Sequence, residues 1–198
     1  MTEPDDILYE HIGQSLESFQ WVAEQLDELL HHGADLLTEA LLNDGKILVC
    51  GMGSSAALGQ GFATGMLSRF DRERPGLPVL ALSGDGSLMS GISYDTNPND
   101  IFARQVRTLG HEQDVLLAIS ASGKAPAVIK AVQAAHDMGL CVVALTGPDG
   151  GDIATLLEEN DVELSVSGAT NTSLQLTHHL ILNCLGALIE HQLFGSEL

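Results

Sequence analysis

The 198-residue sequence has few basic residues, only three cysteines and no long apolar run. Eight Lys and Arg residues stand against 27 Asp and Glu residues, so the formal net charge is −19. Such an acidic surface repels phosphate backbones, which disfavours direct contact with DNA or RNA and favours a basic protein as partner. No apolar run reaches the roughly 20 residues of a membrane helix, and the acidic stretch Met1–Asp6 is unlike a signal peptide. We therefore expect a cytoplasmic protein without membrane contact.

The three cysteines lie singly inside apolar stretches, without the spacing of a metal-binding pair. Cys50, Cys141 and Cys184 are therefore expected to be reduced core residues. We predict neither a disulfide nor a bound metal, and the sequence calls for no cofactor.

Two helices are expected before the first strand. Over residues 5–30, apolar side chains recur at alternating gaps of three and four, which is typical of an amphipathic helix. These residues are Tyr9, Ile12, Leu16, Phe19, Ala23, Leu26 and Leu30. His32-Gly33 is expected to end this helix, and a short second helix runs to about residue 42. Because such a seam often packs on another helix, residues 1–43 are predicted to serve oligomerisation and residues 44–198 to form the core of a single domain.

Strands and helices alternate through the remainder of the chain. Continuous apolar runs such as residues 115–119 and 141–145 are typical of parallel strands that are covered on both faces. Strands are expected near 46–50, 78–82, 114–119, 140–145 and 161–166. Helices are expected near 54–69, 98–109, 124–137, 150–157 and 171–194. The pattern predicts the α/β class, with a doubly wound parallel sheet of about five strands.

Two loops that lead from a strand into a helix are rich in glycine and serine. In open parallel sheets, ligands bind beyond the carboxyl ends of the strands, where backbone amides and serine hydroxyls suit a phosphate. Each loop alone is weak support for a phosphate site, because Gly-Ser turns are common helix caps. The two loops together favour such a site, because they follow strands that are expected to be neighbours. They supply Gly51, Gly53, Ser54 and Ser55 from the first loop and Ser120, Ser122 and Lys124 from the second.

Several longer motifs resemble the sugar isomerase (SIS) family, over nearly the whole chain from about residue 35. They match its phosphoheptose isomerase branch, and most closely the DnaA initiator-associating proteins (DiaA) of that branch. The motifs are Cys50-Gly-x-Gly-Ser-Ser55, Arg69-Phe-x-x-Glu-Arg-Pro75, Asn99-Asp-Ile-Phe-x-Arg104, Gly110-His-Glu-x-Asp through Ser122-Gly123, Val128-Ile-Lys-Ala131 and Ala144-Leu-Thr-Gly-x-Asp-Gly-Gly151. The resemblance implies a flavodoxin-like sheet, a homotetramer and sugar-phosphate sites at subunit boundaries. It also adds Asp95 and Gln175 to the predicted sugar-phosphate residues.

The chain departs from the isomerases at the residues to which the resemblance assigns chemistry. Where those enzymes carry a histidine and a glutamate for a metal and acid–base site, this sequence has Gly61 and Gly65. Asn183 replaces a second histidine, on the helix that carries Gln175. Further replacements are Met52, Ala125 and Thr172. The resemblance therefore implies that the chain has neither catalytic nor metal-binding residues and is a non-catalytic protein. Two alternative functions are an isomerase of sedoheptulose 7-phosphate and a divergent sugar-phosphate sensor.

Two patterns near these positions have competing interpretations. Ala57, Gly61 and Gly65 form a stripe of small residues, which indicates either tight helix packing or an enlarged cavity, and packing is favoured. Gln175, His179 and Asn183 form a polar stripe that could touch a ligand. The pair His178–His179 is more typical of satisfied helix histidines than of metal ligands.

The end of the chain suggests a partner. Leu193 and Phe194 match the Leu-Phe pair through which the DiaA proteins bind the replication initiator DnaA. The resemblance therefore implies a non-catalytic sugar-phosphate-binding protein that binds DnaA and regulates replication initiation without touching DNA. The alternative is that this Leu-Phe pair folds back onto the core.

Overall fold

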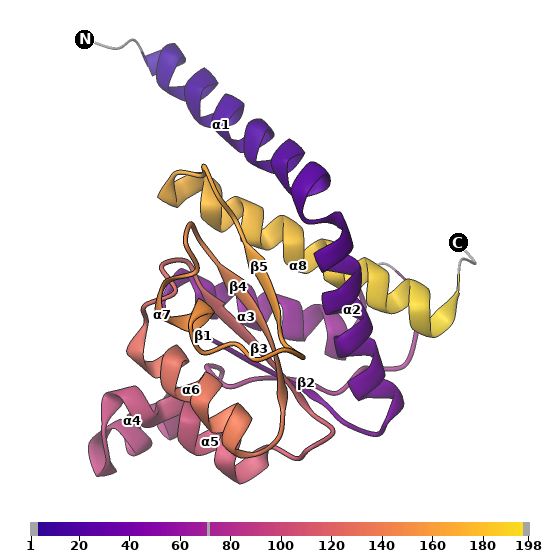
Figure 1. The fold of residues 1–198 in the computed structure, drawn as a ribbon, viewed down its shortest axis with the longest axis vertical. Coiled ribbons are helices and arrows are strands. Elements are labelled where there is room, and N and C mark those ends of the chain that lie inside the picture. Colours follow the sequence, from indigo (N-terminus) through magenta and orange to yellow (C-terminus); the bar gives the residue numbers. More distant parts are fainter. Residues whose placement is uncertain (1–3, 71, 196–198) are drawn as a thin grey trace.

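The computed structural model describes residues 4–70 and 72–195, which form a central sheet with helices on both faces (Figure 1). All five strands are parallel, in the order β2-β1-β3-β4-β5. Their bounds are Ile47–Gly51 (β1), Val79–Ala81 (β2), Val115–Ser120 (β3), Cys141–Thr146 (β4) and Val162–Ser165 (β5). This confirms the expected flavodoxin-like, doubly wound α/β fold.

Successive residues of the central strands pack into two separate cores, because side chains alternate across a sheet. Val49, Leu117 and Ile119 face the core under α1, α2, α3 and α8. Leu48 and Leu116 face the core under α4, α5, α6 and α7. The helices of the first face are Pro4–Gln25 (α1), Asp27–Leu42 (α2), Ser54–Leu67 (α3) and Asn171–Phe194 (α8). Those of the second are Gly86–Asp95 (α4), Ile101–Leu109 (α5), Pro126–Asp137 (α6) and Gly151–Ala154 (α7), with a 3-10 turn (η1) at Pro98–Asp100.

Two local features differ from the sequence predictions. The N-terminal helix ends at Gln25, and the bend lies at Leu26 and not at Gly33, which is buried inside α2 against Val143, Val162 and Leu185. The second difference is α4, which the apolar pattern did not predict. Asp85 caps this helix by accepting hydrogen bonds from the backbone N–H groups of residues 87 and 88.

The first half of α1 projects beyond the body of the chain, as Figure 1 shows. Tyr9, Ile12 and Leu16 of the predicted seam are 74%, 48% and 57% exposed, whereas Leu26 and Leu30 are buried in the chain's own core. Burial of the exposed part between subunits stays a prediction, as does the division at residue 43. None of the helices within the described ranges has the length and apolar character needed to cross a membrane.

Candidate functional site

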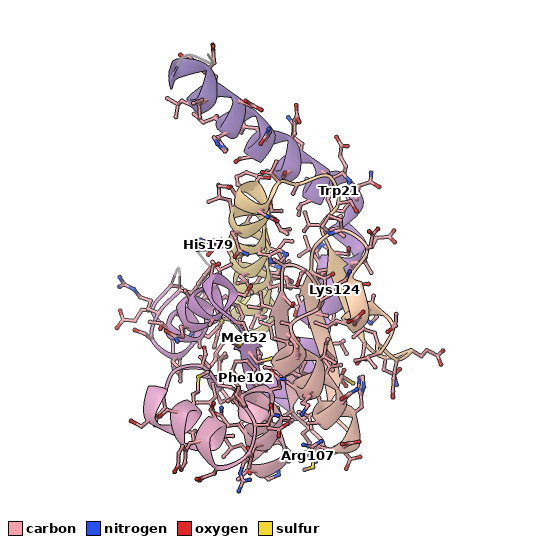
Figure 2. All side chains as sticks on the ribbon, turned by 90° about the vertical axis from the view of Figure 1, so that its left-hand side faces the viewer. Trp21, Met52, Phe102, Arg107, Lys124 and His179 are labelled. Carbon is pink, nitrogen blue, oxygen red and sulfur yellow. The ribbon has the colours of Figure 1, made fainter. Side chains whose placement is uncertain are left out.

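The two Gly-Ser loops lie side by side at the carboxyl edge of the sheet. Strand β1 has β2 on one side and β3 on the other, so the chain changes direction there and leaves a crevice between the loops. Gly51 pairs in register with Ile119, which brings the residues that follow each strand together. Figure 2 labels Met52 on the first loop and Lys124 on the second.

Glycine is required twice in the β1–α3 loop. A Cβ on Gly51 would lie 2.9 Å from the backbone of Ser55, and Gly53 adopts φ +59°. The tight turn places Ser55 under the start of α3, where its side chain is buried and its N–H bonds to the Met52 carbonyl at 3.1 Å. No described side chain caps the N-terminus of α3, so this helix end is suited to an anion.

The β3–α6 loop is held by close backbone contacts with the loop after β4. Gly123 has φ +62°, and a Cβ there would stand 1.8 Å from the Gly150 carbonyl oxygen. The Gly123 N–H bonds to the Ser120 carbonyl at 3.0 Å, and the Lys124 N–H bonds to Ser122 Oγ at 3.2 Å. The Lys124 side chain is exposed at the start of this turn into α6.

A cavity of about 240 Å³ separates the two loops. It is lined by Met52, Ser54, Ser55, Ile119, Ser120, Ala121, Ser122 and Gln175. Five of the predicted sugar-phosphate residues, the four serines and Gln175, therefore line this cavity. The predicted glycines shape the β1–α3 loop, and Lys124 lies on the β3–α6 loop outside the lining. Asp95 is exposed at the end of α4 and does not line the cavity, so its role stays a prediction.

Helix α8 contributes Gln175 to the cavity and carries His178 three residues further along. His178 is fully buried, and its Nε2 lies 3.0 Å from the carbonyl oxygen of Thr146, the last residue of β4. Burial lowers the pKa of His178, and the hydrogen bond to Thr146 opposes this shift. His179 and Asn183 are exposed on the same helix. The two histidines therefore have different environments, which their adjacency in the sequence did not indicate.

Gly61 and Gly65, two of the three glycines in α3, also differ in their surroundings. A Cβ on Gly61 would meet nothing within 4 Å, whereas one on Gly65 would lie 3.1 Å from the ring of Phe70. Tight packing therefore describes Gly65, and Gly61 faces open space in the single chain. Neither position offers a donor atom, so these residues do not fit the metal that the resemblance associates with them.

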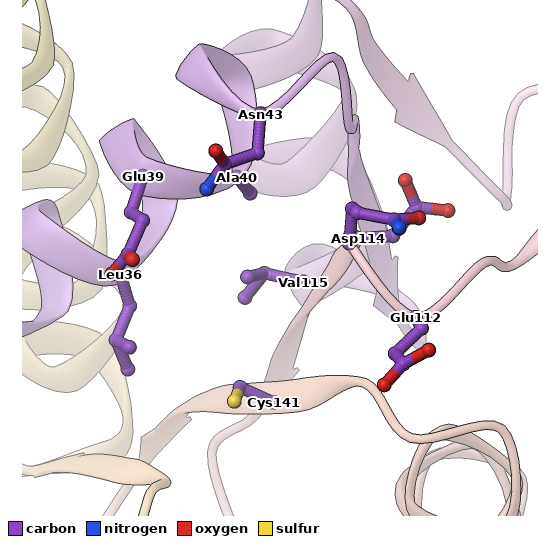
Figure 3. Close-up of a pocket in the computed structure, with 9 residues that line it drawn as sticks. Leu36, Glu39, Ala40, Asn43, Glu112, Asp114, Val115 and Cys141 are labelled. Carbon is purple, nitrogen blue, oxygen red and sulfur yellow. The ribbon is translucent and has the colours of Figure 1, made fainter.

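A second cavity, of about 300 Å³, opens at the opposite edge of the sheet (Figure 3). Acidic and apolar residues line it, including Glu39, Glu112, Asp114 and Cys141. Burial raises the pKa of the Cys141 thiol, and the charges of Asp161, Glu39 and Glu158 raise it further. This environment disfavours an anion.

One buried ion pair was not predicted from the sequence. Arg74 Nε lies 2.6 Å from a carboxylate oxygen of Glu190 on α8, and the Arg74 guanidinium also bonds to the carbonyls of Gly65 and Met66 at the end of α3. The partners are 116 positions apart, so no local pattern could have joined them. The motif around residues 69–75 thereby ties α3 to α8.

Comparison with known proteins gives a consistent set of relatives. The model of the family described as SIS domain matches residues 10–147. A phosphoheptose isomerase of Chromohalobacter salexigens is 44% identical over 186 residues, covering 94% of each chain. The DnaA initiator-associating protein DiaA of Klebsiella pneumoniae is 44% identical over 184 residues, covering 93% of this chain and 94% of that protein. The structure of a phosphoheptose isomerase from Francisella tularensis matches with a TM-score of 0.93 and 35% identity, covering 96% of this chain and 100% of that one. Sequence identity therefore does not distinguish the phosphoheptose isomerases from the DiaA protein as relatives of this chain.

Proposed function

The chain belongs to the SIS-domain family, in its phosphoheptose isomerase branch, and we propose that it binds a sugar phosphate between the β1–α3 and β3–α6 loops. The observation that carries this proposal is the serine-lined cavity at the carboxyl edge of β1 and β3. Hydroxyl groups from both loops surround a space of ligand size, and the uncapped start of α3 adds a favourable dipole. Lys124 supplies positive charge on a chain whose net charge is −19.

Isothermal titration calorimetry with sedoheptulose 7-phosphate tests this proposal. We expect heat of binding for the wild type and a weaker affinity for Ser122→Ala, because one hydroxyl is lost from the cavity. Ser90→Ala removes an exposed hydroxyl on α4 and is the matched control. Absence of binding to sedoheptulose 7-phosphate and to other sugar phosphates would reject the proposal.

Isomerisation of a heptose phosphate is the activity that the names of two relatives favour. That reaction moves a proton between adjacent carbons, so it requires a positioned base and acid. No titratable side chain lines the cavity among the described residues, so a residue outside this lining or one from a second copy would have to supply the base and the acid. Aldose formation from sedoheptulose 7-phosphate, measured with and without zinc, decides the matter. Turnover of roughly 1 per second or faster establishes an enzyme, and its absence with intact binding establishes a binding protein.

A second candidate is a DnaA-binding regulator of replication initiation, which the name of the Klebsiella relative favours. Its specific support is the end of α8, where Leu193 packs against the core and Phe194 is 37% exposed. Arg72 fixes this end by donating hydrogen bonds to the carbonyls of Phe194 and Gly195. An aromatic residue that is held in place and partly exposed suits an interface anchor.

A pull-down with the host's DnaA tests this candidate. We expect retention by the wild type, loss with Phe194→Ala, and retention by the control Leu67→Ala, which removes an exposed side chain from α3. Equal retention by wild type and Phe194→Ala would remove the proposed anchor. No retention by either would leave sugar-phosphate binding without this partner.

We also propose a homotetramer that buries the exposed part of α1. Ile12, Leu16 and Tyr9 form an apolar surface that a monomer would leave in water. Light scattering should give the mass of four chains, and Leu16→Glu should lower it. A monomer at micromolar concentration would refute the proposal.

A further inference from the structure

Gln175 and His178 each retain one buried polar atom without a partner among the described residues. The atoms are Oε1 of Gln175 and Nδ1 of His178. Native domains contain few such atoms, and each calls for an explanation. The two residues are three positions apart on α8, so their side chains lie on one helix face and can meet.

The hydrogen bond to Thr146 defines which ring nitrogen of His178 carries the proton. A carbonyl oxygen only accepts, so Nε2 must be the donor across the 3.0 Å contact. The ring is neutral near neutral pH because burial disfavours its charged form. Nδ1 is therefore an acceptor, and it needs a donor.

Gln175 contains such a donor in its own amide. With Oε1 buried, the two unpartnered atoms are both acceptors and cannot pair. A half-turn of the amide about its last bond exchanges oxygen and nitrogen without changing its shape. The buried position then holds an N–H group, and Oε1 faces the cavity that Gln175 lines.

We infer that His178 positions Gln175, by accepting a hydrogen bond from its Nε2 at Nδ1, and thereby presents Oε1 of Gln175 to a hydroxyl of the bound sugar. This inference rests on the proposed sugar-phosphate function. It divides the cavity into a phosphate end, where Ser122 and Lys124 donate, and a sugar end, where Gln175 accepts. His178 thus contributes to selectivity for a sugar phosphate over inorganic phosphate.

The packing behind the cavity supports this arrangement. Thr146 is the register partner of Ser120, which lines the cavity. One turn before His178, a methyl group of Leu174 lies 2.9 Å from the place of a Cβ on Gly147, so α8 packs closely on the end of β4. His178 is therefore anchored to the strand whose neighbour forms the cavity wall.

Two variants of His178 separate this role from a structural one. In His178→Asn, Oδ1 replaces the acceptor near Nδ1, but the donor to Thr146 is lost. In His178→Gln, Nε2 can still reach Thr146, but the acceptor near Nδ1 is lost. We expect His178→Asn to keep the calorimetric affinity for sedoheptulose 7-phosphate within about twofold and His178→Gln to weaken it by up to about tenfold. Both should bind inorganic phosphate as the wild type does. The reverse order of the two variants, or equal loss for both ligands, would overturn the inference.

Nitrogen NMR of the full chain without ligand tests the pair independently. We expect an unprotonated His178 Nδ1 whose resonance moves in Gln175→Ala, because the hydrogen bond is lost. A protonated Nδ1, or a resonance that does not move, would refute the inference. If the wild type binds neither sedoheptulose 7-phosphate nor any other sugar phosphate, the proposed function fails, and this measurement still decides whether His178 holds Gln175.

Discussion

The two cavities at opposite edges of the sheet are similar in size and opposite in chemistry. The carboxyl-edge cavity, of about 240 Å³, is lined by four serines and Gln175, and Lys124 lies on one of its loops. The amino-edge cavity, of about 300 Å³, is lined by Glu39, Glu112 and Asp114. Of these two cavities, the larger one therefore has the less suitable lining for an anionic ligand. The lining charge and the helix that starts at Ser54 favour the smaller cavity.

The edges also differ in what their polar residues already bind. Asp114 at the amino edge is 2% exposed and accepts hydrogen bonds from the backbone N–H groups of Lys46 and His111, each at 2.8 Å, and from the Lys46 ammonium. Of the four serines that line the carboxyl-edge cavity, Ser122 alone has a side-chain hydrogen bond with another described residue, accepting from the Lys124 N–H. We infer that the amino edge stabilises the fold and that the carboxyl edge is left available for a ligand.

The largest expected effect comes from breaking the amino edge. Asp114→Ala should lower the free energy of unfolding by about 3 kcal/mol, because it leaves the Lys46 ammonium and two N–H groups without their shared acceptor. Urea denaturation measures the loss, and calorimetry of the folded protein should show unchanged sugar-phosphate affinity. Asp137→Ala, which breaks an exposed pair with Arg107, is the control and should change stability by less than about 1 kcal/mol. A large loss of affinity in Asp114→Ala would show that the two edges are coupled.

The second prediction concerns the loss of positive charge at the carboxyl edge. Lys124→Gln should weaken sugar-phosphate binding about tenfold without a change in stability, because its ammonium is exposed and has a ligand as its expected partner. Calorimetry measures the affinity, and the difference from wild type should shrink at high salt. Lys130→Gln is the control, since Lys130 lies on α6 and pairs with Asp100 of η1. Equal weakening by both variants would assign the effect to net charge alone.

Much of the carboxyl edge of the sheet could be predicted from sequence patterns. The strands around residues 115–119 and 141–145 were predictable because parallel strands covered on both faces leave continuous apolar runs. The Gly-Ser loops were predictable because few other residues permit such turns. The roles of His178 and of Arg74 were not, since they depend on Thr146 and Glu190, which are distant in the sequence.

Helix α4 was missed for a different reason. Its residues 86–95 include two glycines and three serines, and only Ile92 is buried, so the apolar periodicity that reveals other helices is absent. The cap residue Asp85 was the available signal. The bend at Leu26 was likewise concealed, because the apolar seam continues across it.

The third prediction asks how far the carboxyl-edge site extends along α3. Gly61→Ala should raise the free energy of unfolding by about 1 kcal/mol, since its Cβ meets nothing within 4 Å and alanine favours the helix. Gly65→Ala should raise the free energy of unfolding by less, because the added Cβ would lie 3.1 Å from the ring of Phe70, which must shift to make room. Thermal or urea unfolding measures both. Weaker sugar-phosphate affinity in Gly61→Ala would place Gly61 within the site, and loss of the tetramer would place it at a subunit contact.

The smallest expected effect tests whether the amino edge disfavours anions, with Cys141 as a built-in probe. Its thiol pKa is raised by burial and by the charges of Asp161, Glu39 and Glu158, whereas burial alone raises the pKa of Cys184. Replacement of Glu39 by Gln removes one negative charge, so the Cys141 pKa should fall and its thiolate fraction at pH 8 should rise. Alkylation by iodoacetamide, followed at each cysteine by mass spectrometry, should then be roughly twofold faster at Cys141.

The other two cysteines are controls in the same sample. The alkylation rate of Cys184 should be unchanged, and Cys50, whose pKa burial raises to about 12, should stay unmodified. An unchanged rate at Cys141 would mean that the acids of this cavity exert little potential on an anion, and Lys124 and the loop hydroxyls would then have to account for the difference between the edges.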